Sequence, residues 1–304
     1  MGKRLKKCIK APTVSFTAPV LLVSQRQASA YPPNSFEQAH FILFCHLHIL
    51  SSLVISLNKT STTASSKTIV LITGANQGIG LEIAKKFATE NPTYHVLMSS
   101  RSLAKCEAAI ASLPSGLSLE PIELDVTSDS SISKAVTAVQ EEYGRLDVLI
   151  NNAGISENTL PEDLTFRQRY TQIIDTNTIS AACVTDAFIP LMRKSPEPRI
   201  ILVSLGLSSI GNTLDPKFPY YGYDGPEYKA SKPAMNMVMA IYAVKYKDEP
   251  IKFNACCPGL RATGLSGGKG NHPSVGAIIV CRLATAGEDG GSGTYTDKDG
   301  TFPW

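Results

Sequence analysis

The 304-residue sequence contains no Cys-x-x-Cys pair and only five histidines. Its seven cysteines are odd in number and irregularly spaced, which predicts reduced, mostly buried thiols rather than a disulfide framework. His46 and His48 are close together, but no acid or third ligand accompanies them, so we expect no metal site. Beyond residue 66 there are 25 acids against 22 Lys and Arg and no basic stripe, so we expect no nucleic-acid partner.

Residues 1–66 contain a single acid, Glu37, against seven Lys and Arg. A basic start, a modest apolar stretch and a small-residue end make residues 1–30 similar to a signal or transit peptide. A second apolar stretch, residues 41–57, is shorter than the usual membrane-spanning helix. We expect residues 1–66 to be an extension that is unfolded, serves targeting or is not part of the working protein. Membrane tethering through residues 41–57 is a less favoured alternative.

The remaining residues, 67–304, begin with a pattern of strand, Gly-rich turn and helix. Residues 69–72 form a continuous apolar run, as in a strand that is buried on both faces. Gly74, Gly78 and Gly80 follow with the spacing G-x-x-x-G-x-G, just before a helix. Glycines at such a turn let the backbone approach a pyrophosphate, which then lies at the helix N-terminus. This stretch therefore predicts a dinucleotide site.

The second strand, residues 95–101, ends in Ser99, Ser100 and Arg101, with no acid. A cofactor with a free ribose 2′-hydroxyl favours an acid at this distance from the glycines, whereas a 2′-phosphate favours an arginine. A guanidinium matches a phosphate with two parallel hydrogen bonds. The pattern therefore favours NADP(H) over NAD(H). The alternative is that Arg101 is an ordinary solvated surface residue.

Strands and helices continue to alternate along the chain. Further strands are predicted at residues 117–126, 146–154 and 199–205, with helices at 129–143 and 167–194 between them. The alternation predicts an α/β fold, a Rossmann-type doubly wound parallel sheet in a single domain after the extension. Ligands of such sheets bind at the carboxyl ends of the strands. The glycine turn, Arg101, Asp125 and the loop after Val203 all fall on that edge.

Four motifs occur in a characteristic order: TGANQGIG at residues 73–80, NNAG at 151–154, YKASK at 228–232 and PGLRAT at 258–263. Together they resemble the short-chain dehydrogenase/reductase family over nearly all of residues 67–304. Within the family, the chain is most similar to fungal carbonyl-reductase-like members. The resemblance implies hydride transfer between NADP(H) and a ketone or aldehyde, with the reverse reaction an alcohol oxidation.

Tyr228 and Lys232 are spaced i and i+4, so they share one face of a helix. A nearby lysine cation lowers the pKa of a phenol, which then gives its proton to a carbonyl oxygen more readily. Without the upstream fingerprint, the same pair would be read as an ordinary surface pair. The resemblance further implies that Lys232 holds the nicotinamide ribose and that Asn177 holds a water that relays protons to Lys232. Alternatively, Asn177 is a core residue that distorts its helix.

The resemblance also implies which residues contact the cofactor, with Asp125 at the adenine and the Pro258 loop at the carboxamide. The expected set is Gly74, Asn76, Gln77, Gly78, Ile79, Gly80, Arg101, Asp125, Val126, Asn152, Ala153, Gly154, Tyr228, Lys232, Pro258, Gly259 and Thr263.

One position departs from the family pattern. Family members usually have a second serine after the fifth strand, and that serine holds the substrate carbonyl. This chain has Ser204 and then Leu205 in that place, with Ser208 and Ser209 further into the loop. Loss of one such donor lowers the rate by roughly a hundred- to a thousand-fold. We expect Ser204 to serve instead, with Ser208 as the second choice.

Two hypotheses of function remain open. The first is an NADPH-dependent reductase of ketones or aldehydes with Tyr228 as proton donor. The second is an NADP-binding protein with weak or no turnover, because Leu205 replaces the serine. A small carbonyl or alcohol molecule is the expected partner, and pairing of subunits through helices near residues 167–194 and 226–247 is an open alternative. The expected location is the cytoplasm, unless residues 1–66 carry an organellar or membrane address.

Overall fold

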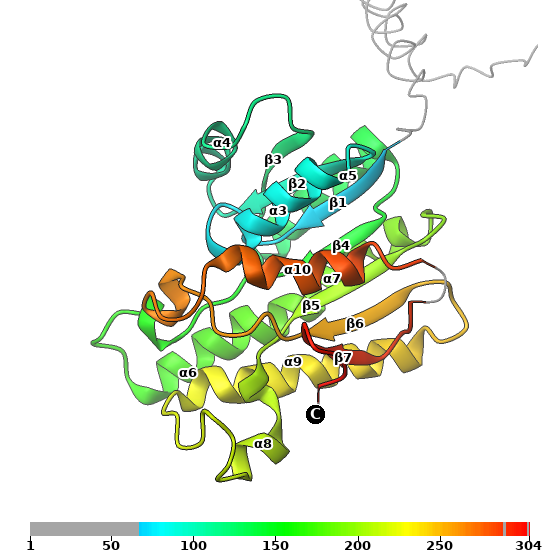
Figure 1. The fold of residues 1–304 in the computed structure, drawn as a ribbon. Coiled ribbons are helices and arrows are strands. Elements are labelled where there is room, and N and C mark those ends of the chain that lie inside the picture. The colour runs from blue at the N-terminus through cyan, green and yellow to red at the C-terminus, as the bar shows by residue number, and fades with distance from the viewer. Residues whose placement is uncertain (1–66, 288–289, 303) are drawn as a thin grey trace, which may run out of the picture. The chain divides into compact units, whose positions relative to one another are not determined.

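A computed structural model describes residues 67–287, 290–302 and 304. Within them, a seven-stranded parallel sheet runs in the order β3-β2-β1-β4-β5-β6-β7 (Figure 1). The strands are β1 Thr68–Ile72, β2 Tyr94–Ser100, β3 Leu119–Glu123, β4 Val148–Asn151, β5 Arg199–Val203, β6 Lys252–Cys256 and β7 Thr294–Thr296. The chain progresses outward in opposite directions from β1 and from β4, so the prediction of a Rossmann-type doubly wound fold is confirmed.

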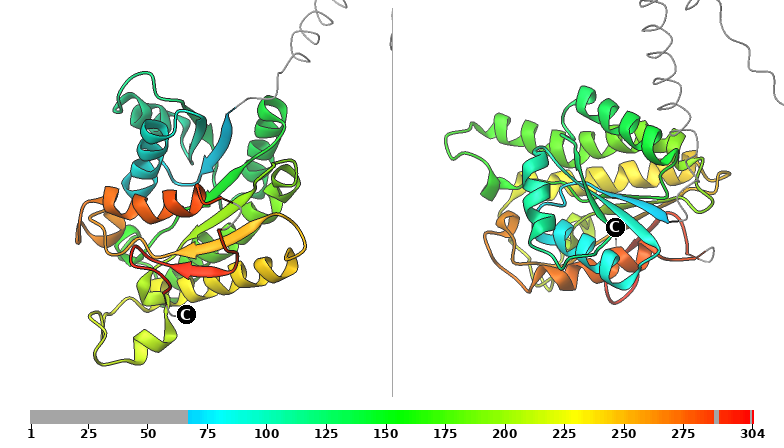
Figure 2. Two further views of the ribbon diagram at one scale, coloured as in Figure 1. Left: turned by 45° about the vertical axis from the view of Figure 1, so that its right-hand side comes forward. Right: turned by 90° about the horizontal axis from the view of Figure 1, so that it is seen from above.

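Helices cover both faces of the sheet, which is why the central strands β1, β4 and β5 are almost entirely buried (Figure 2). In β1, Ile69 and Leu71 face one helical layer, whereas Val70 and Ile72 face the other. The first layer contains α5 (Asp129–Tyr143), α7 (Ser180–Met192) and α9 (Pro226–Lys245), and the second contains α3 (Gly78–Glu90), α4 (Leu103–Ala111) and α10 (Pro273–Ala284). Helix α4 was not among the sequence predictions.

The single helix predicted over residues 167–194 is interrupted. The structure has α6 (Phe166–Ile174), a π-helical turn η2 (Asp175–Ile179) and then α7. A π turn adds a residue to one helical turn, and such turns occur frequently at functional sites. Asn177 lies inside this turn, so it does sit at a distortion of the helix, as the alternative interpretation of this residue expected.

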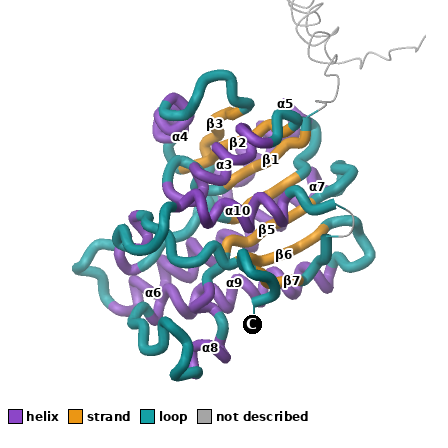
Figure 3. The backbone as a smooth tube through the Cα atoms, in the orientation of Figure 1, coloured by secondary structure: helices purple, strands orange, loops and turns teal. Residues whose placement is uncertain are grey.

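Other predicted boundaries are longer than the observed ones. Strand β4 ends at Asn151 rather than at residue 154, and β5 ends at Val203 rather than at residue 205. In both cases the chain leaves the sheet at its carboxyl edge to form loops, drawn in teal in Figure 3. The loop after β5 contains two short helical pieces, η3 (Gly206–Ser208) and α8 (Ile210–Leu214).

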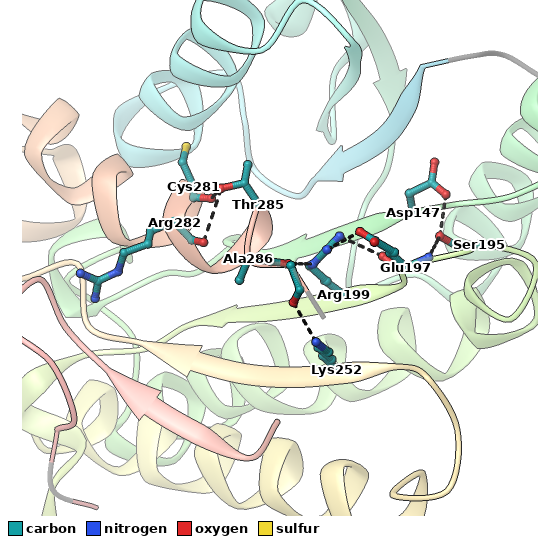
Figure 4. A network of polar contacts seen from close by, with 10 residues as sticks. Asp147, Ser195, Glu197, Arg199, Lys252, Cys281, Arg282, Thr285 and Ala286 are labelled. Carbon is teal, nitrogen blue, oxygen red and sulfur yellow. Dashed lines mark hydrogen bonds and ion pairs between the residues drawn. The ribbon is translucent and has the colours of Figure 1, made fainter. Parts of the chain in front are cut away.

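The amino-terminal edge of the sheet is held by polar contacts that involve no ligand (Figure 4). Arg199, at the start of β5, pairs with Glu197 at 2.6 Å and donates to the carbonyl of Ala286, just after α10. Asp147, before β4, accepts hydrogen bonds from Ser195 and from the Ile69 N–H. These contacts hold the starts of strands β1, β4 and β5 to the loops that precede β4 and β5 and to the loop that follows α10.

No helix within the described part of the chain is long and apolar enough to cross a membrane. The predicted extension, including the apolar stretch 41–57, lies outside the described residues. Residues 67–287, 290–302 and 304 also contain no cluster of three or more His, Cys, Asp or Glu suited to a metal.

Candidate active site

A cavity of about 1720 Å³ opens at the carboxyl edge of the sheet. Among the residues predicted from the sequence, it is lined by Gly74, Asn76, Gln77, Gly78, Ile79, Arg101, Asp125, Val126, Asn152, Ala153, Gly154, Ser204, Tyr228, Lys232, Pro258, Gly259 and Thr263. Gly80 and Asn177 are buried and do not line the cavity. Residues that follow six strands, β1 to β6, are therefore brought to one place, as the doubly wound fold requires.

The glycine turn after β1 forms a cradle with no room for side chains. Gly74 and Gly78 have positive φ angles of 64° and 57°, which favour glycine. A Cβ atom at Gly74 would lie 3.0 Å from the Ala153 backbone, and one at Gly80 would lie 2.4 Å from the Gly74 carbonyl. A Cβ at Gly78 would lie 3.2 Å from the Thr263 methyl. This close approach of backbone to cavity fits a dinucleotide phosphate at the N-terminus of α3.

Asn152 fixes the cradle from the neighbouring strand end. Its side-chain amide donates to the carbonyls of Thr73 and Gly74, at 2.9 and 3.1 Å. The Thr73 hydroxyl in turn accepts the N–H groups of Asn152 and Ala153. The NNAG segment therefore holds the shape of the turn, in addition to lining the cavity.

The other end of the cavity carries the predicted adenosine contacts. Arg101 is exposed and follows β2 directly. Asp125 follows β3, and its carboxylate accepts hydrogen bonds from the Thr127 N–H and hydroxyl. The guanidinium and the carboxylate thus lie at adjacent strand ends, where the cavity is open to solvent.

Tyr228 and Lys232 line the cavity from α9, and the buried Asn177 bonds Ser231 of the same helix. The Lys232 Nζ donates to the Val203 carbonyl at 3.0 Å and lies 5.7 Å from the centre of the Tyr228 ring. The Asn177 amide bonds both backbone groups of Ile155 and the Ser231 hydroxyl. Gly154 lies against both Asn177 and Lys232: a Cβ atom there would be 3.2 Å from Asn177 Oδ1 and 3.7 Å from Lys232 Nζ.

Burial dominates the ionisation of this pair. Loss of solvent lowers the pKa of Lys232 to about 8. Burial raises the pKa of Tyr228, and the charges of Cys257 and Glu157 act in the same direction. The shift for Tyr228 is opposite to the one expected from Lys232 alone. The phenol is therefore protonated at neutral pH, which is the state that can donate a proton.

Leu205 and the three serines after β5 have separate surroundings. The Ser204 hydroxyl donates to Ser208 at 3.4 Å, and Ser208 bonds the Tyr295 hydroxyl at 3.0 Å. The Tyr295 hydroxyl in turn donates to the Leu205 carbonyl. Ser204 and Leu205 line the cavity, whereas Ser208 and Ser209 do not.

Several residues near the site were not among the predicted site residues. The Glu157 carboxylate accepts the Tyr228 N–H at 2.8 Å, so it caps the start of α9 beside the phenol. Tyr223 lines the cavity before α9, and Tyr295 supports the loop after β5 from β7. Arg261 lines the cavity from the PGLRAT segment. Glu157 and Tyr295 belong to no local motif, so only the folded chain identifies them.

The fold and this site define a short-chain dehydrogenase. The family model for short chain dehydrogenase matches residues 68–273, and the chain belongs to this family of oxidoreductases acting on CH–OH and carbonyl groups. A short-chain dehydrogenase of Penicillium roqueforti is 39% identical over 231 residues, which cover 74% of this chain and 91% of that protein. A carbonyl reductase [NADPH] of Sus scrofa is 28% identical, over 77% of this chain and 94% of that one.

Solved structures agree with the fold. The NADPH-bound carbonyl reductase from chicken fatty liver is 28% identical, with a TM-score of 0.65, over 78% of this chain and 99% of that chain. Salutaridine reductase from Papaver somniferum has a TM-score of 0.65 at 23% identity, over 76% of this chain and 100% of that chain. The second likeness concerns the fold alone.

Proposed function

We propose that the protein is an NADPH-dependent reductase that transfers a hydride to a ketone or aldehyde. The observation that carries this proposal is the placement of Tyr228 and Lys232 together in the wall of the cavity that begins at the glycine turn. The cofactor supplies the hydride when it is bound. A proton donor is then needed where the carbonyl oxygen gains negative charge.

The chain's own residues divide the remaining work. Tyr228 gives its hydroxyl proton to the carbonyl oxygen. Lys232 stabilises the phenolate that remains and holds hydroxyl groups of the cofactor ribose. Asn177, through the π turn, holds a relay toward Lys232 and fixes the Ile155 backbone beside it. Ser204 orients the substrate carbonyl, since it is the serine of this loop that lines the cavity and its bond to Ser208 is long.

The choice of NADP(H) rests on Arg101 and on the absence of an acid at the end of β2. An exposed guanidinium at the cavity rim is free to pair with a 2′-phosphate. The names of two relatives, both carbonyl reductases with NADPH, support the same choice.

Purified protein tests the proposal in two separate measurements. Isothermal titration gives the affinity for NADPH and NADH, and loss of NADPH absorbance gives the rate with a panel of ketones and aldehydes. We expect tighter binding of NADPH and turnover of at least part of the panel. Binding without any turnover would contradict the reductase. Binding of neither cofactor would contradict both the reductase and the NADP-binding protein without turnover.

A specific observation favours the second candidate, an NADP-binding protein with weak or no turnover. Leu205, an apolar residue, lines the cavity at the position where family members usually have a serine. The three nearby serines donate or accept hydrogen bonds elsewhere: Ser204 with Ser208, and Ser209 with the Trp304 carbonyl. The rate of the Leu205→Ser variant separates the two candidates.

We further propose that residues 67–304 form the working domain and residues 1–66 a dispensable or targeting extension. Activity and fractionation of the full chain against residues 67–304 test this. Pairing of subunits is supported by an exposed apolar stripe of Met237, Ile241 and Val244 on α9. Light scattering of the working domain would give its mass.

A further inference from the structure

Arg261 is a buried cation to which the proposed function assigns no role. It lies between β6 and α10, is only 8% exposed and lines the cavity. Within residues 67–287, 290–302 and 304, no carboxylate forms an ion pair with it. Its Nη1 donates to the carbonyl of the adjacent Leu260 at 3.2 Å, and its Nε is buried without a partner. Most of the five donors of the guanidinium are therefore unused.

Two glycines make room for this guanidinium. A Cβ atom at Gly259 would lie 2.7 Å from Arg261 Nη2, and a Cβ at Gly276, in the first turns of α10, would lie 3.2 Å from Nε. Asp297 also lines the cavity, but its carboxylate accepts the N–H groups of Asp299 and Gly300 in its own turn. The space between Gly259 and Gly276 fits the guanidinium closely, and no carboxylate of the described residues pairs with it there.

The segment that carries Arg261 is fixed beside the phosphate cradle. The Leu260 carbonyl accepts the Asn271 N–H, and the Asn271 carbonyl accepts the Ala262 N–H, so the loop is bridged on both sides of Arg261. Two residues on, the Thr263 methyl lies 3.2 Å from where a Gly78 Cβ would be. Gly78 is the first residue of α3, whose N-terminus favours an anion.

A buried charge without a partner is costly, so a cation kept in such a slot calls for an anion supplied by a ligand. We propose that Arg261 binds the diphosphate of the cofactor, opposing the α3 N-terminus with paired hydrogen bonds from its two Nη nitrogens. This inference rests on the proposed binding of NADP(H). It makes Arg261 a cofactor-binding residue that the sequence motifs do not identify, distinct from Arg101 at the 2′-phosphate.

Binding of three ligands to the full chain distinguishes the roles of Arg261 and Arg101. NADPH and 2′-phospho-ADP-ribose both contain the diphosphate, whereas adenosine 2′-monophosphate lacks it. By isothermal titration, Arg261→Met should weaken the first two by about 10- to 100-fold and the third by less than about 2-fold, because a charge-assisted pair is lost. Arg101→Met should weaken all three. Lys247→Met, which removes an exposed charge from a residue that does not line the cavity, is the control and should change none of them by more than about 2-fold.

Stability provides the second measurement. Since Met replaces an unpaired buried charge with an apolar chain of similar length, Arg261→Met should melt at the same or a higher temperature than the wild type, while its stabilisation by NADPH shrinks. Arg261→Lys keeps the charge without the paired geometry and should bind NADPH about 3- to 10-fold more weakly than the wild type.

Two results would overturn the inference while leaving the proposed function intact. One is unchanged affinity of Arg261→Met for NADPH. The other is an effect only on KM for carboxylated carbonyl substrates, which would make Arg261 a substrate-anion residue. A lower melting temperature of both variants with unchanged affinity would make its role structural. Failure of the wild type to bind NADPH at all would instead overturn the proposed function.

Discussion

Replacement of Leu205 by serine is the change that bears most directly on the function. Leu205 lies at the cavity wall with extended backbone angles, φ −154° and ψ 141°, which serine adopts without strain. Its carbonyl already accepts a hydrogen bond from the Tyr295 hydroxyl, a contact that is independent of the side chain at 205. The substitution therefore adds a hydroxyl at the cavity without altering the support of the loop.

The magnitude follows from the value of one preorganised donor. A hydroxyl aimed at the developing charge on a carbonyl oxygen contributes about 10²- to 10³-fold in rate. With Ser204 proposed as a partial donor, a gain of about 100-fold in kcat is expected, and the larger value only if Ser204 contributes nothing. Removal of the half-buried leucine side chain costs about 1–2 kcal/mol of stability, so rates should be compared well below the melting temperature.

The assay compares Leu205→Ser with Leu205→Ala, which creates the same space without a hydroxyl. NADPH consumption is followed with one ketone and one aldehyde from the panel, at saturating cofactor. We expect Leu205→Ala to remain within about 3-fold of the wild type, because it supplies no donor. Equal rates for the two variants would refute the reasoning, since the serine hydroxyl would then do nothing that the added space does not.

A double-mutant cycle with Ser204→Ala identifies the donor in the native chain. If Ser204 holds the substrate carbonyl, its loss should lower kcat by about 10-fold or more in the wild type and much less in Leu205→Ser, where the new hydroxyl takes its place. Additive effects would contradict a shared role for the two positions.

Further predictions concern the proposed proton donor, its lysine and the cofactor phosphate. Tyr228→Phe should lower kcat by at least about 100-fold, because the hydroxyl that donates the proton is removed. Its affinity for NADPH should stay within about 3-fold of the wild type, because the ring remains; steady-state rates and isothermal titration measure the two effects. Because the folded-state pKa of Lys232 is about 8, below its ordinary value of 10.5, the cost of burying the protonated lysine is present below pH 8 and vanishes toward pH 10.5. The free energy of unfolding of Lys232→Met at pH 7 should accordingly exceed that of the wild type by up to about 3 kcal/mol. Denaturant titrations should show this difference closing between pH 8 and 10.5, and the control Lys229→Met should show no such pH-dependent difference. In the wild type, kcat/KM for reduction should fall as pH rises through about 8, since Lys232 loses its charge. Arg101→Ala should reduce the preference for NADPH over NADH by about 10- to 100-fold in KM.

The parts of the site that are set by short-range patterns could be predicted from the sequence. The glycine turn follows from a buried strand, three glycines and a helix within 25 residues, and the Tyr228–Lys232 pair follows from the helical repeat. Their meeting in one cavity follows from the parallel sheet, because its strand ends share one edge.

The parts that depend on long-range contacts could not be predicted. Tyr295 supports the Leu205 carbonyl across 90 residues, and Glu157 caps Tyr228 across 71. The π turn at Asn177 falls within a continuous helical pattern, so periodicity gives no sign of it. The raised pKa of Tyr228 was missed for a related reason, since burial is a property of the folded chain and outweighs the neighbouring lysine.

The hydrogen bonds beneath the loop after β5 explain why the family serine can be replaced without disturbing the rest of the site. Ser204 donates to Ser208, Ser208 to Tyr295, and Tyr295 to the Leu205 carbonyl, while the Asn236 amide completes Ser208 at 2.9 Å. None of these bonds uses the side chain at position 205. The longest of them is the 3.4 Å bond of Ser204, the one serine of this network that lines the cavity, so a carbonyl that reaches the hydroxyl can compete for it at little cost. The loop is thus built so that Ser204 is the hydroxyl most easily released to a substrate.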